Sequence, residues 1–413
     1  MMQEAIILAG GKGTRLQAVV SDVPKPMAPI GEKPFLFYQM KYLISRGIDR
    51  IILSVGYKSE VISDYFGNEF QGVPLVYVHE ENPLGTGGGV RLALNAANSN
   101  EVLVCNGDTF FEFELSKLQF AHRQFQGTLT FSVHEIENNG RYGGMRIGSD
   151  AKVNGFIPKN VTGKTYINAG IYLINKTEFL AQTPADTPFS LEDDFLAVKV
   201  GEGRFYACPF SASQFIDIGI PEDYEKGQSL IPTWSSKEST EFKTVFLDRD
   251  GVLNRKIDNG YVTKPEELEI LPGVRETLKE WGDAGKEFFI VTNQRGVGRG
   301  LMTIEELHAV HFTLLKKMEA VGVKIRDIKF CTDTENSSPC RKPNPGMLLE
   351  LFKEYPHIEK DKVIFIGDSL SDLQAGKNAG VKTAFLTNDK PLNFEVLQKA
   401  DHVSGQLSGL RLN

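Results

Sequence analysis

Short apolar segments alternate with longer amphipathic segments twice along this 413-residue chain, once on each side of a polar stretch at residues 232–241. Such alternation predicts strands joined by helices, and therefore a mostly parallel sheet covered on both faces. Because the chain exceeds the usual size of one hydrophobic core, we expect two α/β domains of the doubly wound kind. The polar stretch is rich in serine and lacks periodicity, so it is the predicted linker between domains at 1–231 and 242–413.

The same patterns locate the expected elements. In the first domain, strands are predicted at 5–8, 51–55, 75–78, 102–105, 127–133 and 169–174, and helices at 34–45, at 88–98 and from Pro221 onward. In the second domain, strands are predicted at 244–247, 288–292, 363–366 and 383–386, and helices at 274–281, 304–320 and 345–354. The two halves show no internal repeat.

Composition argues against several classes of function. The formal net charge is −7 and the pI is near 5.7, whereas proteins that bind nucleic acids or membrane surfaces usually present a basic face. No apolar run approaches the roughly 18 residues of a membrane span, and the first residues lack the basic leader of a signal peptide. Four cysteines spread along the chain do not make a disulfide framework. We therefore expect a cytoplasmic protein that acts on small molecules, without nucleic-acid or membrane partners.

A glycine-rich loop follows the first predicted strand, where α/β sheets place ligand loops. Its sequence is Gly10-Gly11-Lys12-Gly13-Thr14-Arg15-Leu16. Gly10, Gly11 and Gly13 let backbone N–H groups approach phosphates, and Arg15 can bind a phosphate through two hydrogen bonds. The loop is not a Walker A loop, which ends in Gly-Lys-Ser/Thr. Nor is it a dinucleotide-binding loop, because Leu16 stands where that loop needs Gly or Ala. It predicts a site for a triphosphate.

Four further segments supply groups that suit the same ligand. Lys25 lies between two prolines, which fix it in extended backbone. A second glycine-rich turn containing Gly85 opens a predicted helix, where a base or ribose can lie against the backbone. Asp108 follows a buried strand, and Asp217 lies in a later apolar run. Two carboxylates at strand ends suit Mg²⁺, a hard ion that prefers oxygen ligands.

Together these motifs resemble those of the sugar-1-phosphate nucleotidyltransferases, across the whole predicted first domain. Within that family they are most similar to the D-glycero-α-D-manno-heptose-1-phosphate guanylyltransferases. The resemblance implies a Rossmann-like mixed sheet. It also implies a reaction in which the sugar phosphate itself attacks the α-phosphorus of GTP, so that cations and Mg²⁺ supply most of the catalysis.

The resemblance also implies a role for each matching residue. The nucleotide and the charge of the transition state would be held by Gly10, Gly11, Gly13, Arg15, Lys25 and Gly85. Magnesium would be bound by Asp108 and Asp217. The sugar phosphate would be bound by Lys159, Asn168 and Gly170, and the sugar hydroxyls by Glu192. The chain departs from the family where Lys159 follows a proline, since the sugar-side lysine usually follows a glutamate.

Two aspartates separated by one residue end the first predicted strand of the second domain. Alternate residues of a strand point to one side, so Asp248 and Asp250 would share a side of its tip. Two carboxylates that close need a cation or a shared proton. Thr292 ends the next strand, Lys342 follows in a Cys-Arg-Lys-Pro segment, and Asp368 follows a third strand. The set predicts a site at which a carboxylate attacks a phosphate.

In this order the motifs resemble those of the haloacid dehalogenase-like phosphatases, over residues 243–413. The resemblance implies a Rossmann-type domain in which Asp248 is the nucleophile and Asp250 the general acid and base. It implies that substrate is bound by Thr292, Asn293, Arg341 and Lys342, and Mg²⁺ by Asp248, Asp250 and Asp368, with Asp372 as a weaker candidate. The finer pattern resembles the heptose-bisphosphate phosphatases, and histidinol-phosphate phosphatases share much of it.

Many of these relatives carry a zinc loop with a Cys-x-His pair and a later Cys-x-Cys pair. Here Cys331 precedes Asp333, and Ser338 precedes Cys340, so two of the four ligands remain. A carboxylate is a poor replacement in a thiolate site. We therefore expect no structural zinc, and we interpret Cys331 and Cys340 as small apolar residues on a shortened loop.

The two resemblances together imply a bifunctional enzyme of nucleotide-sugar synthesis. The second domain would remove the 7-phosphate from D-glycero-D-manno-heptose 1,7-bisphosphate, and the first would couple the product to GTP. Because the nucleotide loops are mostly backbone, the same chemistries on a hexose 1-phosphate with UTP, dTTP or CTP stay open. So do a histidinol-phosphate-like phosphatase and a nucleotide-sugar sensor with one inactive domain.

Overall fold

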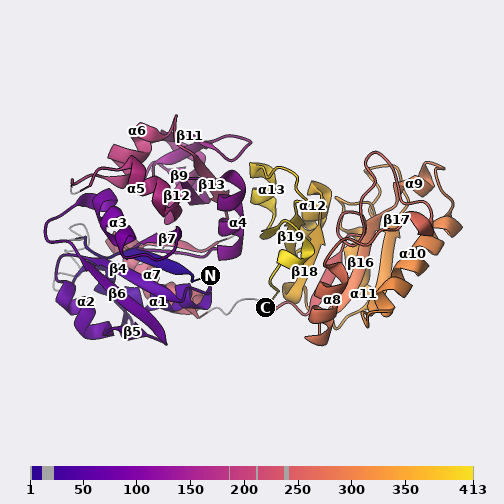
Figure 1. Ribbon diagram of the computed structural model, residues 1–413, viewed down its shortest axis with the longest axis horizontal. Helices are drawn as coiled ribbons and strands as arrows, with labels where there is room; N and C mark the ends of the chain where they lie inside the picture. The colour runs from indigo at the N-terminus through magenta and orange to yellow at the C-terminus, as the bar shows by residue number, and fades with distance from the viewer. Residues whose placement is uncertain (1, 12–22, 186, 211–212, 237–240, 413) are drawn as a thin grey trace. The chain divides into compact units, whose positions relative to one another are not determined.

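The computed structural model describes residues 2–11, 23–185, 187–210, 213–236 and 241–412. The chain divides into two compact units, Met1–Ser239 and Thr240–Asn413, drawn in indigo to magenta and in orange to yellow in Figure 1. Helix α7 (Pro221–Ser235) closes the first unit, so residues 232–235 are helical and not irregular linker as predicted. Among the described residues, no helix is both long and apolar enough to cross a membrane.

A mixed sheet forms the centre of the N-terminal unit. Its strands lie in the order β11-β10-β12-β7-β1-β4-β6-β5, and β9 joins it by pairing with β12 and β13. Their bounds are β1 (Glu4–Leu8), β4 (Arg50–Val55), β5 (Glu69–Phe70), β6 (Val73–His79), β7 (Glu101–Asn106), β9 (Leu129–Asn139), β10 (Gly144–Ile147), β11 (Val153–Ile157), β12 (Thr162–Asn175) and β13 (Phe205–Pro209). Neighbours among β7, β1, β4 and β6 are parallel, whereas β12 is antiparallel to β7. The predicted Rossmann-like mixed sheet is confirmed.

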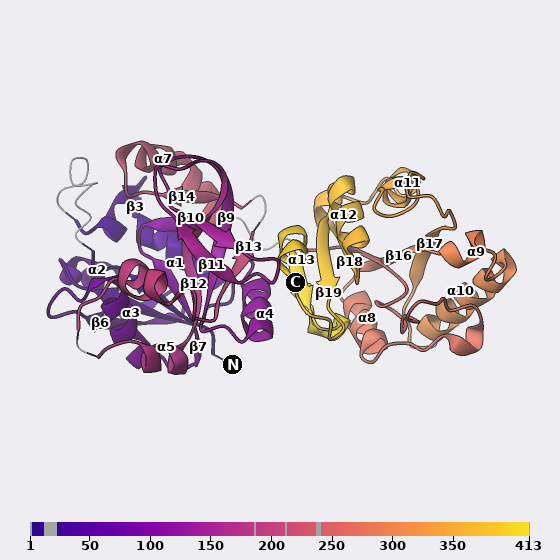
Figure 2. The ribbon, with the colours of Figure 1, turned by 90° about the horizontal axis from the view of Figure 1, so that it is seen from above.

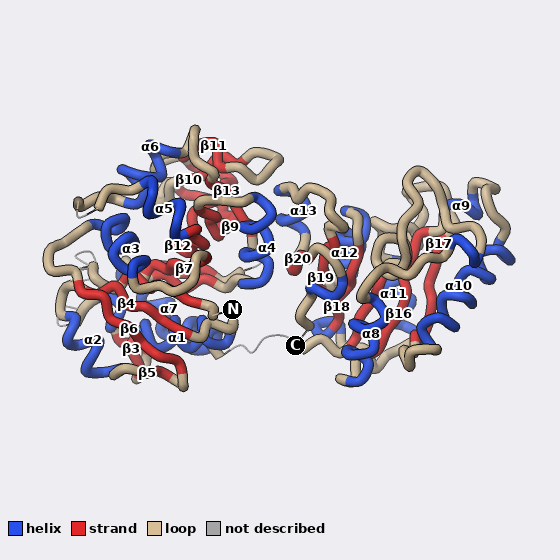
Figure 3. The backbone as a smooth tube through the Cα atoms, viewed as in Figure 1, coloured by secondary structure: helices blue, strands red, loops and turns tan. Residues whose placement is uncertain are grey.

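Helices cover this sheet on both faces, and Figure 3 shows α3 on the opposite side from α1. The helices are α1 (Phe35–Ser45), α2 (Ser59–Phe66), α3 (Gly85–Asn95), α4 (Leu115–Phe125), α5 (Lys176–Gln182) and α6 (Ala197–Lys199), with one-turn η1 (Lys25–Met27) and the π-helix η2 (Leu191–Leu196). Two short pairs of strands lie outside the main sheet: β2 (Pro29–Ile30) with β3 (Lys33–Pro34), and β8 (Thr109–Phe111) with β14 (Phe215–Asp217).

Helix α7 returns to the segment that follows η1. The amide Nε2 of Gln228 donates to the carbonyl of Pro29 (2.9 Å), and the N–H of Gly31 donates to Oε1 of Gln228 (2.9 Å). The hydroxyl of Tyr224 donates to the same Pro29 carbonyl. The last helix of the unit therefore fixes the segment that carries Lys25.

The C-terminal unit has a six-stranded parallel sheet in the order β17-β16-β15-β18-β19-β20. The strands are β15 (Thr244–Leu247), β16 (Glu287–Asn293), β17 (Ile325–Cys331), β18 (Val363–Gly367), β19 (Lys382–Leu386) and β20 (His402–Ser404). The helices are α8 (Val274–Asp283), α9 (Arg295–Gly298), α10 (Ile304–Glu319), α11 (Gly346–Glu354), α12 (Leu370–Ala379) and α13 (Phe394–Lys399), with one-turn η3 (Pro265–Glu267), η4 (Lys360–Lys362) and η5 (Leu407–Gly409).

Alternation along the strands divides the core of this unit into two layers. Val245 and Leu247 of β15 pack with residues of α8 and α10, whereas Phe246 packs with residues of α11 and α12. Figure 2 shows the sheet between these helices. The predicted Rossmann-type domain is confirmed, and the apolar character of β15 follows from its burial on both faces.

Candidate active sites

The segments that follow the four adjacent parallel strands of the N-terminal unit meet at one edge of the sheet, because parallel strands end on the same side. They line a cleft of about 830 Å³. The lining includes Gly10, Gly11, Lys25, Glu80, Gly85, Asp108 and Glu192. The predicted ligands Gly13 and Arg15 lie outside the described residues.

The turn at Gly85 is shaped by close contact with a second segment. Gly85 has φ of +72°, and a Cβ placed on it would lie 2.5 Å from the carbonyl oxygen of Phe189. Only glycine fits both conditions. The next residue, Thr86, accepts from the N–H of Leu191 (2.9 Å) and donates to Oε2 of Glu192 (2.8 Å). Through Thr86, the turn that begins α3 therefore holds Glu192 of η2 at the cleft.

Two carboxylates, Asp108 and Asp217, lie close together at the small sheet of β8 and β14, and Asp108 lines the cleft. Asp217 pairs in register with Thr109, and the N–H of Ile218 donates to the carbonyl of Asp108 (3.0 Å). The ammonium of Lys25 contacts Asp108 directly and lies 3.8 Å from Oδ1 of Asp217. Antiparallel pairing therefore brings together the two predicted magnesium ligands, with a lysine beside both.

Burial raises the pKa of Asp217, and the nearby Asp108 raises it further, while Lys25 and the N–H of Gly219 act in the opposite direction. That N–H donates to Oδ1 of Asp217 (2.7 Å). Two carboxylates in such a place are stabilised by positive charge. The donor set is oxygen only, so it fits Mg²⁺.

The residues predicted to bind the sugar phosphate are only partly brought together. Asn168 donates to the hydroxyl of Tyr172 (2.7 Å) and accepts from the N–H of Gly170 (2.9 Å). Tyr172 in turn donates to Oε1 of Glu192 (3.5 Å) at the cleft. Lys159 is exposed in the turn between β11 and β12 and does not line the cleft. The hydrogen bonds from Asn168 through the buried Tyr172 to Glu192 therefore support one side of the cleft.

Glu80 is a cleft residue that the sequence motifs did not identify. It follows β6, where its Oε2 accepts from the N–H of Leu84 (3.1 Å) and its Oε1 accepts from the hydroxyl of Ser54 (3.2 Å). Cβ atoms placed on Gly10 or Gly89 would lie 3.1 and 2.8 Å from Oε1. Its carboxylate is therefore fixed between the two glycine-rich segments. Position at a strand end was its only sequence signal.

The C-terminal unit has its own cavity, of about 240 Å³, at the carboxyl ends of β15, β16 and β18. The lining comprises Asp248, Asp250, Lys256, Ile257, Gly260, Tyr261, Val262, Thr292, Asn293, Lys342, Ser369, Ser371 and Asp372. Five of the predicted site residues are among them. The order of the strands explains their meeting, since β15 lies between β16 and β18.

Lys342 is buried at the floor of this cavity. Its Nζ lies 2.9 Å from Oδ1 of Asp248 and 2.6 Å from Oδ1 of Asp372, and it donates to the carbonyl of Val291 (2.9 Å). Burial raises the pKa of Asp248 to about 7, and Asp372 adds to the rise, while Lys342 opposes it. Asp248 therefore depends on nearby cations to remain a carboxylate.

Asp250 is held differently from Asp248. Its carboxylate accepts from the guanidinium of Arg249 (2.9 Å), from Nδ2 of Asn254 (2.9 Å) and from Nε2 of Gln294 (3.0 Å). Although burial acts to raise its pKa, these three partners lower it below the ordinary value. Gln294 also donates to the hydroxyl of Thr292 (2.9 Å). The motif residues are thus joined by two side chains, Arg249 and Gln294, to which no role was predicted.

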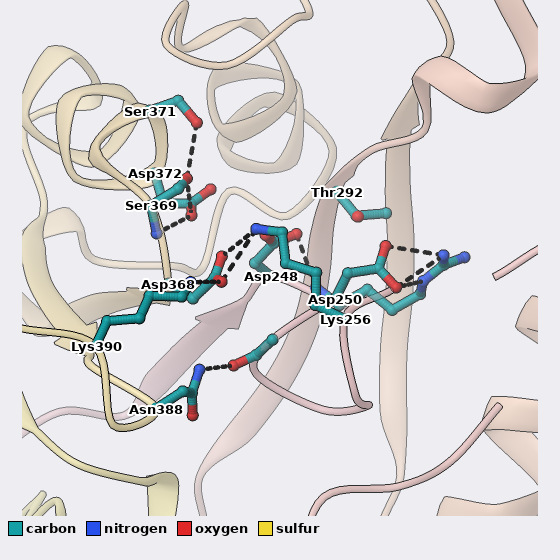
Figure 4. A network of polar contacts seen from close by, with 12 residues as sticks. Asp248, Asp250, Lys256, Thr292, Asp368, Ser369, Ser371, Asp372, Asn388 and Lys390 are labelled. Atoms are coloured by element: carbon teal, nitrogen blue, oxygen red, sulfur yellow. Dashed lines mark hydrogen bonds and ion pairs between the residues drawn. The ribbon is translucent and has the colours of Figure 1, made fainter. Parts of the chain in front are cut away.

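Asp368 and Asp372 complete an acidic group with Asp248. Carboxylate oxygens of the three lie within 4.8 Å of one another, and all three residues are buried. The carboxylate of Asp250, also predicted among the magnesium ligands, lies outside this group and accepts from Arg249, whereas Asp372 lies within the group. Figure 4 shows Asp368 between two lysines, Lys256 and Lys390. Three clustered carboxylates matched by lysines are a donor set that fits a divalent ion.

Asn293 and Arg341, both predicted to bind substrate, take different positions relative to the cavity: Asn293 lines it and Arg341 does not. Asn293 and Lys342 exchange two hydrogen bonds of 3.1 Å, from Nδ2 to carbonyl and from N–H to Oδ1. Arg341 donates to Oδ1 of Asn336 (3.2 Å) and does not line the cavity. Burial lowers its pKa, and the charges of Arg295 and Arg299 lower it further. Arg341 therefore lies in a basic neighbourhood beside the site.

Cys331 and Cys340 form a disulfide, which corrects their interpretation as separate small apolar residues. The loop between them follows β17 and brings the two sulfurs together, although the cysteines are nine positions apart in the sequence. Sulfur and carboxylate atoms of Cys331, Asp333 and Cys340 also lie within 4.8 Å of one another. A disulfide uses both thiolates that a metal would need. Cys105 and Cys208 are free and buried.

Known proteins resemble each unit separately. The family described as nucleotidyl transferase matches residues 4–233, and the family described as haloacid dehalogenase-like hydrolase matches residues 233–380. The chain is 44% identical to the D-glycero-alpha-D-manno-heptose 1-phosphate guanylyltransferase of Aneurinibacillus thermoaerophilus over 228 residues, covering 55% of this chain and 98% of that protein. It is 42% identical to the enzyme of the same name from Campylobacter jejuni over 221 residues, covering 54% and 96%.

A solved structure of a phosphatase also matches part of the chain. It is the D,D-heptose 1.7-bisphosphate phosphatase from B. bronchiseptica complexed with magnesium and phosphate, with 28% identity and a TM-score of 0.36. The match covers 41% of this chain and 95% of that chain.

Proposed function

The chain belongs to the nucleotidyl transferase family, and we propose that it is a bifunctional enzyme of nucleotide-sugar synthesis. The C-terminal domain removes the 7-phosphate from D-glycero-D-manno-heptose 1,7-bisphosphate. The N-terminal domain transfers GMP from GTP to the resulting D-glycero-α-D-manno-heptose 1-phosphate and releases pyrophosphate. The observation that carries the proposal is the likeness of the first domain to two heptose 1-phosphate guanylyltransferases, on a chain that continues into a haloacid dehalogenase-like hydrolase domain. The product of the second domain is then the substrate of the first.

In the guanylyltransferase domain, the backbone of Gly10 and Gly11 meets the triphosphate, together with Gly13 and Arg15. Lys25 neutralises the charge that develops as the sugar phosphate attacks the α-phosphorus. The pair of Asp108 and Asp217 holds Mg²⁺, which supplies positive charge to the phosphates when bound. Support for this pair comes from its oxygen donors and from the raised pKa of Asp217, which a cation would reverse.

Glu80 favours GTP over the other nucleotides. Guanine carries two adjacent donors, N1–H and the exocyclic NH₂, and a carboxylate can accept from both at once. Uracil, thymine and cytosine do not present that pair. Glu80 lines the cleft between the two glycine-rich segments with its carboxylate already fixed by Ser54 and Leu84. This side chain supplies the base recognition that backbone loops lack.

On the sugar side of the cleft, Glu192 accepts from heptose hydroxyls. It is held by Thr86 and, through Tyr172, by Asn168. Gly170 keeps Asn168 in place through its N–H. Lys159 meets the sugar phosphate only if its exposed turn moves toward the cleft when substrate binds.

In the phosphatase domain, Asp248 attacks the 7-phosphorus and forms an aspartyl-phosphate, while the bond to the sugar oxygen breaks. Asp250 gives a proton to that oxygen and then takes one from the water that hydrolyses the intermediate. The charge of a bound phosphate raises the pKa of Asp250 toward the value that an acid needs. Lys342, Thr292 and Asn293 hold the phosphoryl oxygens, with Arg341 beside them.

Asp248, Asp368 and Asp372 surround the position that Mg²⁺ would take, either as direct ligands or through water. The ion, when bound, offsets the charge of the phosphate and of the nucleophile. We place both reactions in the cytoplasm, with small molecules as the only partners. We also propose that the boundary between the domains lies after helix α7 and that the protein holds no structural zinc.

The test supplies heptose 1,7-bisphosphate with each nucleoside triphosphate in turn and identifies the products by mass. We expect GDP-heptose, phosphate and pyrophosphate with GTP. Equal yields with UTP, dTTP or CTP would contradict the assignment of the base. Faster hydrolysis of histidinol phosphate would contradict the assignment of the sugar. A protein that bound GTP without turnover would instead be a sensor.

A further inference from the structure

Two lysines from different segments bind the same buried carboxylate in the C-terminal unit. Nζ of Lys256 lies 2.9 and 3.0 Å from the two oxygens of Asp368, and Nζ of Lys390 lies 3.0 Å from one of them. Figure 4 shows the two side chains reaching Asp368 from opposite sides. Lys256 lines the cavity over Asp248, whereas Lys390, which follows β19, does not. Of these two lysines, Lys256 is the one that can contact a ligand in the cavity.

The negative charges of the acidic group are equal in number to the positive charges of the lysines that pair with it. Asp248, Asp368 and Asp372 carry three negative charges and are matched by Lys342, Lys256 and Lys390. A divalent ion bound to these oxygens adds two positive charges at the same place. Positive groups a few ångströms apart in a buried site repel strongly. Binding of the ion must therefore displace an ammonium group from Asp368.

Lys256 and Lys342 are the two cations among the described residues that line the cavity. Lys342 contacts Asp248, Asp372 and the carbonyl of Val291, and its side chain is 2% exposed. Among the residues that the structure describes, Lys256 pairs with Asp368 and no other acid, and its side chain is 46% exposed. Lys256 is therefore the cation that can move without leaving a second group unpaired.

We propose that Lys256 is a substrate-binding residue of the phosphatase site. It pairs with Asp368 in the metal-free protein. Once a divalent ion holds Asp368, it binds an anionic group of the substrate other than the phosphoryl group that is transferred. Its loop neighbours Gly260, Tyr261 and Val262 line the same cavity, so its side chain stays over the site after it leaves Asp368. The assignment rests on the function proposed above, in which that second anion is the 1-phosphate.

The test compares two substrates that differ only in this anion, heptose 1,7-bisphosphate and heptose 7-phosphate. Lys256→Gln should raise KM for the bisphosphate about tenfold, which is the loss of one modest charged contact, with kcat little changed. KM for the 7-phosphate should stay the same, and Lys256→Arg should restore the bisphosphate value. Lys390→Gln is the matched control, because it removes the other lysine of Asp368 and should leave the ratio of the two KM values unchanged.

Binding of Mg²⁺ alone, followed by calorimetry, gives a second readout. Both glutamine variants should bind Mg²⁺ at least as tightly as the wild type, because each removes a competing cation. Weaker binding by Lys256→Gln, or an equal rise in KM for both substrates, would make Lys256 part of the metal or phosphoryl site and overturn the proposal. Unchanged KM values would also overturn it. A wild-type protein that hydrolyses neither heptose phosphate would instead contradict the proposed function, and this assignment with it.

Discussion

Nζ of Lys342 lies 2.9 Å from Oδ1 of Asp248, and both side chains are almost closed off from solvent. The same ammonium lies 2.6 Å from Asp372, so one lysine neutralises two buried carboxylates. The reactive carboxylate of the phosphatase site is thus held in its charged form by a group that also fixes the position of a second acid.

Replacing Lys342 by Met should abolish phosphate release and destabilise the C-terminal unit. The change leaves Asp248 and Asp372 buried without their common partner, and breaking a buried pair costs about 3–5 kcal/mol. Phosphate release should fall by at least about a hundredfold. Both effects can be measured on the full chain, by phosphate assay and by urea unfolding. Loss of pyrophosphate release from GTP and heptose 1-phosphate in the same variant would contradict this assignment.

The two activities should be separable by one substitution in each unit. Asp108→Asn removes half of the carboxylate pair beside Lys25 and should lower pyrophosphate release by at least about a hundredfold while sparing phosphate release. Asp248→Asn removes the nucleophile and should do the reverse. Each variant serves as the control for the other. If either variant kept both activities, the assignment of its site would be wrong.

Glu80→Gln should weaken the preference for GTP. The amide keeps one acceptor oxygen but turns an NH₂ group toward a guanine donor, so KM for GTP should rise about 10- to 100-fold. Glu81→Gln is the matched control, since Glu81 is the next residue and also lines the cleft. Initial rates with GTP, UTP and CTP measure the effect. An equal change in both variants would point to the net charge of the cleft and not to recognition of the base.

The C-terminal unit should become less stable as the pH is lowered, because of His311. Burial lowers the pKa of His311 to about 3, and the charge of Arg249 lowers it further. The unfolded chain binds a proton near pH 6.5, so the contribution is complete above that pH and is lost as pH falls toward 3. His311→Leu should reduce the slope of unfolding free energy against pH by up to about 1.4 kcal/mol per unit.

The matched control for this prediction is His308→Leu, on the same helix but exposed. The chain has two tryptophans, and Trp281 lies in the C-terminal unit. Urea unfolding of a Trp234→Phe background, followed by Trp281 fluorescence from pH 7 to about 4, therefore reports this unit alone. Equal slopes for His311→Leu and its parent would refute the prediction.

The thiol count should report the disulfide. Without reductant, denatured protein should show two reactive thiols, from Cys105 and Cys208, and reduction should raise the count to four. Reduction should also lower the stability of the C-terminal unit by about 2–3 kcal/mol, as expected for opening a short loop. Metal analysis is the control. Stoichiometric zinc with four reactive thiols would show that the cysteines bind metal instead.

Buried parallel strands could be predicted well from the sequence. Thr244–Leu247 was located without error because a strand buried on both faces is a continuous apolar run. Strand β17 (Ile325–Cys331) was missed because it is the edge strand of its sheet and mixes charged with apolar residues. Edge strands keep one side in solvent, so their sequences lose the apolar signal.

The sites could be predicted where several motif residues occur in a known order. A single side chain that reaches the site without such a motif could not be predicted. The motifs located Asp248, Thr292 and Asp368, which follow or end buried strands. They also located Lys342, which lies in the loop between β17 and α11. They did not show that Arg249 would pair with Asp250, because spacing in sequence does not report which acid a neighbouring arginine contacts. Glu80 was missed because a lone glutamate at a strand end has no distinguishing neighbours.

Helix α7 limits where a second domain can be fused to the first during evolution. Gln228 and Tyr224 on that helix hold Pro29 and Gly31, a few residues from Lys25. A gene that joins a second catalytic module to this one must therefore make its junction after Gln228, because an earlier junction would remove the residues that hold the segment of Lys25. Recombination can add a second module only at a point where the first module already contains every residue that its own site needs.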